Sequence, residues 1–180
     1  MKKILILVLL LSTLNYGTSF ATQISVGDTA SYVGTQIEYG SDQLNLTWTV
    51  ESLNEHQMEV GVKLIRIKDG VVLGEQKVNV TSSDQWEKLC EEYKFVDKCE
   101  GSNTVIVPAG LFQNSCRAEY KNVKVPLAPL PSTRSVIANG NGDMSPSVPF
   151  CFLTNSYDGK AATSYKLESY KFVNPVGVLK

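Results

Sequence analysis

The sequence predicts one mainly β domain with one short helix, cross-linked by disulfide bonds and preceded by an export signal. Apolar and polar residues alternate along several short segments, which is the period-two pattern of half-exposed strands. All four cysteines lie beyond the segment that resembles an export signal. The 180-residue length suits one domain, and the net charge of −1 provides no basic excess for binding nucleic acid.

Residues 1–21 have the organisation of a cleaved export signal. Two lysines precede an apolar run that ends at Leu11, and Ser19 and Ala21 supply the small residues required just before the cleavage point. A membrane anchor is the alternative, but a spanning helix needs ~20 apolar residues and this run is too short. The basic start and Ile/Leu run are bacterial in style. We therefore expect residues 22–180 to form a single exported domain, periplasmic or secreted, with no membrane anchor after cleavage.

The first half of the exported part is predicted to form strands. Residues 44–50 and 58–64 alternate between apolar and polar side chains, and residues 32–39 show a less regular version of the pattern. An Asp-Gly pair at 69–70 favours a tight hairpin turn, because glycine readily adopts positive φ. Residues 71–80 are expected to return as the next strand.

Residues 84–93 are predicted to form the helix of the domain. Asp84 and Glu87 have the spacing of a capping box at its start. Positions separated by three or four residues then present one face of a helix, made by Trp86, Leu89, Cys90 and Tyr93.

The second half is predicted to be extended again. Residues 104–107 form a β run that a proline stops, an Ala-Gly pair permits a reversal, and residues 111–120 form the next strand. The density of proline and glycine in residues 123–149 predicts long surface loops with at most one or two short strands. Residues 150–153 and 163–173 are expected to form a final hairpin, joined across Asp-Gly.

The four cysteines are best interpreted as two disulfide bonds, because an exported protein meets an oxidising environment. They are Cys90, Cys99, Cys116 and Cys151. A catalytic thiol would need a base, and His56 is the single histidine. A zinc site would need short paired spacings that these residues lack. The residues alone permit three connectivities.

One stretch resembles a known signature. Val107-Pro108-Ala109-Gly110-Leu111-Phe112, followed by Cys116, is similar to the V-P-A-G-T-F…C pattern of small exported bacterial β proteins, many of unknown function. The upstream Cys99-Glu100-Gly101-Ser102 extends the likeness, and so do the later segments Ser147-Val148-Pro149-Phe150 and Tyr165-Lys166-Leu167-Glu168-Ser169-Tyr170. The chain departs at Leu111, where threonine is usual, and at Cys151, where glycine is usual.

This resemblance carries expectations for the fold and the disulfides. It implies a strongly curved antiparallel sheet or half-barrel, like those of periplasmic lipoprotein carriers. It also implies the pairs Cys99–Cys116 and Cys90–Cys151, since Cys90 and Cys151 are both additional to the pattern. The signature has no established activity, so it implies no reaction.

Candidate chemistry is sparse, and no cofactor or metal is expected. The acids nearest one another could serve glycosidic chemistry, but a solvated helix face explains most of them equally; they are Glu91, Glu92, Asp97 and Glu100. Asn139, Asn141 and Asp143 alternate like the first ligands of a calcium loop. Met144 and Phe150 then replace the glycine and glutamate that such a loop requires, so a flexible turn is the simpler interpretation.

Two functions remain as hypotheses. The first is a non-enzymatic exported module that binds an envelope protein or an apolar ligand. In its carrier version a curved sheet holds a lipid or acyl chain, and the lining would be Trp48, Trp86, Phe112 and Phe152. The same rings would serve equally as ordinary core. The second hypothesis is an exported hydrolase that uses the acidic residues.

Overall fold

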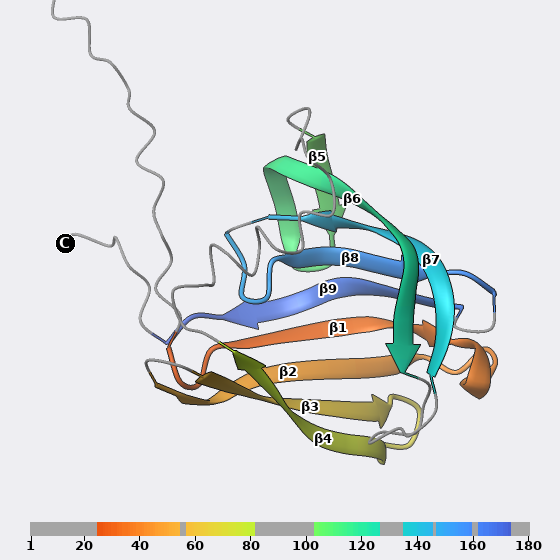
Figure 1. The fold of residues 1–180 in the computed structure, drawn as a ribbon, viewed down its shortest axis with the longest axis horizontal. Coiled ribbons are helices and arrows are strands. Elements are labelled where there is room, and N and C mark those ends of the chain that lie inside the picture. Colours follow the sequence, from red (N-terminus) through yellow and green to blue (C-terminus); the bar gives the residue numbers. More distant parts are fainter. Residues whose placement is uncertain are drawn as a thin grey trace, which may run out of the picture.

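A nine-stranded antiparallel sheet is formed by the residues that the computed structural model describes, which are 25–54, 57–81, 103–126, 135–145, 147–159 and 162–173 (Figure 1). The strands are β1 (Thr29–Gln36), β2 (Leu44–Leu53), β3 (Gln57–Arg66), β4 (Val71–Thr81), β5 (Asn103–Val107), β6 (Gly110–Pro126), β7 (Ser135–Met144), β8 (Phe152–Tyr157) and β9 (Thr163–Lys171). The 3₁₀ turn η1 (Ile37–Tyr39) follows β1. The predicted helix over residues 84–93 lies outside the described residues.

Two meanders make up the sheet. Its strand order is β4-β3-β2-β1-β9-β8-β7-β6-β5, so β1–β4 and β5–β9 each pair in sequence. The pairing of β1 with β9, from Thr29 opposite Lys171 to Gln36 opposite Thr163, joins the two meanders at the centre. The mainly β, antiparallel prediction is therefore confirmed. The sheet is open, with β4 and β5 as its edges among the described strands.

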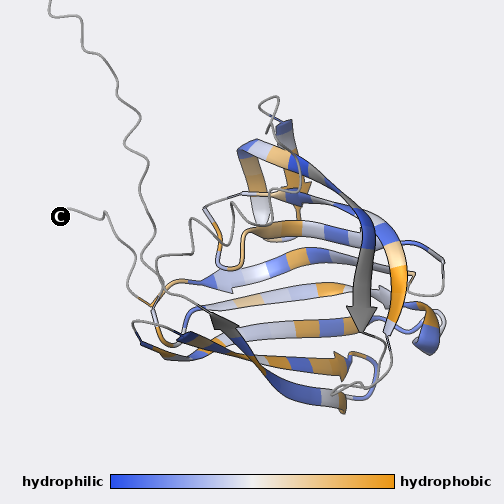
Figure 2. Ribbon diagram, viewed as in Figure 1, coloured by the Kyte–Doolittle hydropathy of each residue, from blue (hydrophilic) through white to orange (hydrophobic). Residues whose placement is uncertain are grey.

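One face of the sheet, called the inner face below, carries the core. Several strands bury side chains at alternate positions, and these include Tyr32 on β1, Leu44 on β2, Leu64 on β3 and Leu167 on β9. Hydrophobic and hydrophilic residues accordingly alternate along β2 and β3 (Figure 2). This alternation, read from the sequence, is what predicted the strands of the first meander, and both Asp-Gly turns also form where expected, with positive φ at the glycine.

The opposite, outer face is held by polar side chains. Asn45 on β2 donates through Nδ2 to the Ser31 hydroxyl at 2.8 Å and to Glu168 Oε2 at 2.9 Å. Thr47 donates to Asn45 Oδ1 at 2.9 Å. These bonds link β2 to β1 and β9 on the solvent side, so the outer face is polar and hydrogen-bonded.

Two bulges bend β6, the longest strand. Where β6 pairs with β5, the register shifts between Asn103 and Val105 of β5. Where β6 pairs with β7, it shifts between Tyr120 and Val123 of β6. Asn114 and Asn122 on β6 both have φ of 55° at these irregularities. Asparagine tolerates the left-handed region better than most residues, and a bulge increases local bend and twist. As a result β6 and β7 run across the direction of β1, β2 and β9 (Figure 1).

Glycines on the inner face make room for tyrosine rings. Gly34 pairs with Tyr165, and Gly140 pairs with Tyr157. A Cβ atom at Gly34 would lie 2.7 Å from Tyr165 Cδ1, and one at Gly140 would lie 2.7 Å from Tyr157 Cδ1. In each pair the ring of one strand therefore lies across the bare backbone of its neighbour.

The signature hairpin docks onto the sheet as predicted from its residues. Val107 ends β5 and is 5% exposed, Gly110 begins β6 with φ of 139°, and Phe112 is 7% exposed in the core. The Ala109 N–H donates to the carbonyl oxygen of Leu167 at 3.2 Å. The reversal therefore anchors the edge hairpin to β9.

The prediction of long surface loops over residues 123–149 is wrong where two long strands occupy this region. β6 continues to Pro126, and residues 135–144 form β7, which carries the whole Asn-Gly run. Glycine is ordinarily depleted in strands, but here Gly140 meets the Tyr157 ring from the inner face, where a larger residue would clash. Composition alone does not reveal that compensation.

A strained turn connects β7 to β8, so β8 begins at Phe152 rather than at the predicted Phe150. The Cys151 N–H donates to the Val148 carbonyl at 3.2 Å, and Pro149 and Phe150 are the central residues of this turn. Phe150 has φ of 64° and Cys151 has φ of 61°, although both are buried. A glycine at position 151 would adopt this left-handed conformation without the steric cost of a Cβ atom.

No helix in the described ranges is long and apolar enough to span a membrane.

Candidate ligand-binding site

Aromatic rings cluster at the centre of the inner face. The half-buried Trp48 ring on β2 lies edge-on to Tyr32, Phe150 and Phe152, with centroid distances of 5.7, 5.3 and 6.1 Å. The structure thus brings together two of the four predicted lining residues, Trp48 and Phe152. Phe112 joins the core through the β5–β6 hairpin and has Tyr170 as its aromatic neighbour at 6.0 Å.

Among the residues that the structure describes, five buried polar atoms around this cluster have no hydrogen-bond partner. They are Tyr32 Oη, Gln36 Oε1, Trp48 Nε1, Asn155 Oδ1 and Tyr165 Oη. All five side chains lie on the inner face. Tyr32 and Gln36 flank Gly34 at alternate positions of β1. Gly34 pairs with Tyr165 on β9, and Tyr165 pairs with Asn155 on β8, so these side chains point to the same side of the sheet. Tyr32 and Tyr165 are only 3% and 6% exposed. A buried polar group without a partner costs about 1–3 kcal/mol, so five in one place are unusual.

The two buried phenols act as neutral hydroxyls. Desolvation raises the pKa of Tyr32 well above its ordinary value of 10. Desolvation likewise raises the pKa of Tyr165, against a smaller opposing effect of the nearby Gln36 side chain. Gln36 lies close enough to influence Tyr165, yet its amide oxygen accepts no hydrogen bond of normal geometry. Each hydroxyl can therefore donate and accept.

The interior has little formal charge. Among the buried residues in the described part of the chain, Asp28 is the one with a charged side chain. Its carboxylate accepts from the backbone N–H of Ser25 at 2.8 Å and of Val173 at 2.7 Å. Asp28 precedes β1, whereas Gln36 ends it, so this charge lies at the far end of the strand from the Gln36–Tyr165 pair.

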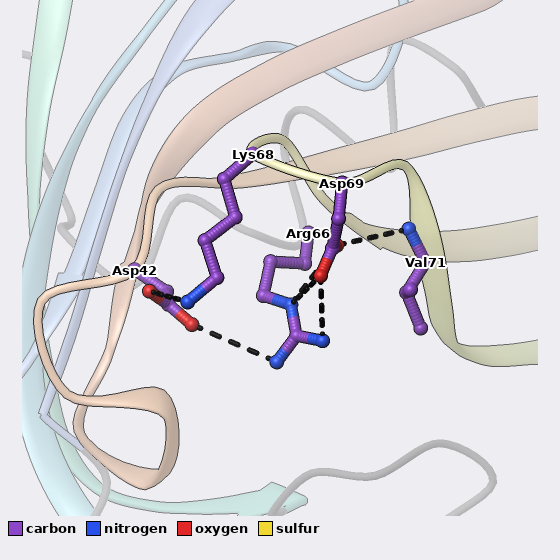
Figure 3. Close-up of polar contacts among 5 residues, drawn as sticks. All are labelled: Asp42, Arg66, Lys68, Asp69 and Val71. Atoms are coloured by element: carbon purple, nitrogen blue, oxygen red, sulfur yellow. Dashed lines mark hydrogen bonds and ion pairs between the residues drawn. The ribbon is translucent and has the colours of Figure 1, made fainter.

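A balanced ionic network lies at the Gln36 end of the sheet (Figure 3). Asp42 binds Lys68 at 2.8 Å and Arg66 at 3.7 Å, and Arg66 also binds Asp69 at 2.9 Å. The Arg66 hydrogen bond holds the pKa of Asp69 below its usual value. Two cations thus match two carboxylates, and the network ties the loop before β2 to the β3–β4 turn without adding net charge.

A polar groove of about 460 Å³ lies on the other face, between β6 and β7. Its residues are Arg117, Glu119, Lys121, Asn122, Asn139, Gly140 and Asn141. The groove side chains that are charged are all exposed. It has no aromatic or buried polar member in the described part, so we regard it as a solvated surface.

The residues that resembled a calcium loop are strand residues with protein partners. Asn139 Oδ1 accepts from the Asn122 N–H at 3.0 Å, and Asn141 Oδ1 accepts from Arg117 at 3.1 Å. Asp143 Oδ2 accepts from the Thr154 hydroxyl at 2.8 Å. The flexible turn expected there is β7 instead. Within the described ranges no three His, Cys, Asp or Glu side chains form a metal-binding group.

Several sequence candidates lie outside the described residues. These are Trp86, His56, Cys90, Cys99 and the acids Glu91, Glu92, Asp97 and Glu100. The hydrolase hypothesis therefore stays a prediction. Cys116 and Cys151 are both in the disulfide-bonded state rather than free thiols. The pairs Cys99–Cys116 and Cys90–Cys151 remain predictions, because one member of each lies outside the described part.

Sequence reasoning missed Gln36, Asn155 and Tyr165. The sequence did contain a signal for two of them, because Gln36 and Tyr165 stand at alternate positions in line with the apolar residues of their strands. A polar atom on an apolar face becomes informative only when the pairing of β1, β9 and β8 is known, because no local pattern brings these three together.

The fold resembles that of a solved protein from Bacteroides fragilis. No protein family model and no curated protein matches this chain. The crystal structure of that protein, which is thought to be exported and has a YmcC-like fold, superposes with a TM-score of 0.52. The match covers 84% of this chain and 99% of that chain at 9% sequence identity. The likeness is therefore one of fold, an open antiparallel sheet of the YmcC-like type.

Proposed function

We propose that this protein is an exported, non-enzymatic binding module that holds one amphiphilic ligand on its inner face. The ligand would place an apolar chain against Trp48 and Phe152 and a hydrogen-bonding head against Gln36, Tyr165 and Asn155. The observation that carries the proposal is the group of five unpartnered buried polar atoms beside a half-buried aromatic cluster.

The free energies of burial and of hydrogen bonding favour a ligand that has both an apolar chain and a hydrogen-bonding head. Each unpartnered buried polar atom costs about 1–3 kcal/mol, and a ligand that provides hydrogen bonds recovers part of that cost. Burial of an apolar chain adds ~0.8 kcal/mol per methylene group. Leu46 and Trp48 are half-buried, in contrast to the fully buried Leu44 and Val50 on the same face of β2, so this part of the face retains accessible apolar surface.

Export is supported by the N-terminal signal pattern, by the even number of cysteines and by the likeness in fold to a protein thought to be exported. A curved sheet held by disulfide bonds suits an oxidising compartment. The half-barrel interpretation, with the inner face as its concave side, is supported by β6 and β7 running across the direction of β1, β2 and β9 (Figure 1).

Native mass spectrometry of the protein, purified from its exporting cell without detergent, is the direct test. A reproducible additional mass that organic solvent extracts as an amphiphile is expected. The test variant Trp48→Ala should lose the additional mass. The matched control Ile106→Ala, at an exposed edge-strand position, should keep it. The bare polypeptide mass from wild-type protein, combined with no uptake of added acyl compounds, would refute the proposal.

A further inference from the structure

The unpartnered atoms of the inner face specify the chemistry of the ligand's head group. Gln36 Oε1 and Asn155 Oδ1 are acceptors and need donors, whereas Trp48 Nε1 is a donor and needs an acceptor. The hydroxyls of Tyr32 and Tyr165 can take either role. A complementary head group must therefore offer donors and acceptors together.

Charge on the head group is disfavoured at this site. Around the cluster, the buried described residues include no lysine, arginine or histidine that could pair with an anion. Asp28, the one buried carboxylate in the described part of the chain, already accepts hydrogen bonds from two backbone N–H groups. The nearest ionic network is internally neutral, since Arg66 and Lys68 match Asp42 and Asp69. Transfer of an unpaired charge from water into such surroundings is strongly unfavourable.

We infer that the site selects an uncharged amphiphile whose head carries hydroxyl or amide donors beside a carbonyl acceptor, such as a glycerol ester of a fatty acid. This inference rests on the proposed function and narrows it. A free fatty acid at neutral pH supplies acceptors alone and brings a charge, so it leaves Gln36 and Asn155 without donors. A cationic amphiphile supplies donors but leaves Trp48 without an acceptor.

Trp48 offers an internal reporter for the test. The chain has two tryptophans, so Trp86→Phe leaves Trp48 as the single source of indole fluorescence. Three probes of equal chain length would be titrated below their aggregation concentrations: monolauroylglycerol, laurate and dodecyltrimethylammonium. We expect monolauroylglycerol to bind at least tenfold more tightly than laurate at pH 8. Laurate should bind more tightly as the pH falls towards its own pKa, because its protonated form is neutral and can donate.

Two variants separate the head-group contacts from the apolar contacts. Gln36→Leu and Tyr165→Phe should each reduce the preference for the glycerol ester several-fold, with little change in laurate binding. Ile137→Ala, at a 64% exposed position of β7, is the control and should change neither. Equal or tighter binding of laurate at pH 8 would overturn the inference and leave the proposed function standing. No response to any probe, with correctly folded protein, would overturn both.

Discussion

Alanine in place of Gly34 or Gly140 should destabilise the curved sheet. The new Cβ at Gly34 would lie 2.7 Å from Tyr165 Cδ1 and against the carbonyl oxygen of Ser164, and the Gly140 site repeats this geometry with Tyr157 and Ser156. Ordinary carbon contacts are ~3.5–4.0 Å, so the ring must move by about 1 Å. The carbonyl belongs to a paired backbone that cannot move without disturbing the ladder. Overpacking of this kind costs typically 1–3 kcal/mol.

The expected loss is about 2 kcal/mol for each variant, or ~4–8 °C in Tm for a domain of this size. Chemical denaturation followed by fluorescence would measure it, provided that the transition is two-state. Gly61→Ala is the matched control, because its Cβ would meet only the flexible Glu51 side chain, and its stability should stay within ~0.5 kcal/mol of wild type. Unfolding of all three variants at the same denaturant concentration would refute the packing argument.

Three further outcomes are expected. Under reducing conditions Cys151→Gly should be ~1–2 kcal/mol more stable than Cys151→Ser in denaturation, because glycine relieves the left-handed backbone at φ 61° while both variants lack the disulfide. Burial raises the pKa of Tyr32 and Tyr165. The stability that their neutral hydroxyls allow is therefore complete below pH ~10 and declines as the pH rises, because the unfolded chain then loses these protons first. Tyr32→Phe should accordingly raise the pH at which the protein unfolds in alkali, as followed by circular dichroism. The pKa of Asp69 is lowered by its hydrogen bond from Arg66, so Asp69→Asn should be less stable than wild type at neutral pH, and that difference should close in urea titrations below pH ~4.

The strands with simple alternation were predictable from the sequence. β2, β3 and β4 form within three residues of the predicted ranges, because each pairs with its neighbour in the sequence. The β5–β6 reversal was also predictable, since proline and glycine determine its backbone directly. Such features depend on neighbours in the chain.

β7 was not predictable in the same way. Its asparagines and glycines are typical of turns, and its strand conformation depends on Gly140 lying against the Tyr157 ring from β8. The length of β6 was missed for a related reason, because Asn122 absorbs a bulge rather than ending the strand. In both cases the decisive partner lies on another strand.

The candidate site was half predictable. Trp48 and Phe152 are large apolar residues in predicted strands, so their presence in the interior follows from composition and period. Gln36, Tyr165 and Asn155 meet because β1 pairs with β9 and β9 with β8. No local pattern specifies those pairings.

The β1–β9 ladder also governs the order in which a growing chain can fold. The first meander needs only local hairpins, so it can assemble once synthesis has passed Thr81. The edge of β1 that pairs with β9 then stays unpaired until Lys171 of the 180-residue chain has been synthesised, because β9 is complete only at that residue. Uncovered strand edges readily pair with other chains, so this interval is when the nascent protein is most prone to aggregate. A chain truncated before Thr163 would keep that edge permanently open, and a chaperone that holds the early meander would prevent the error.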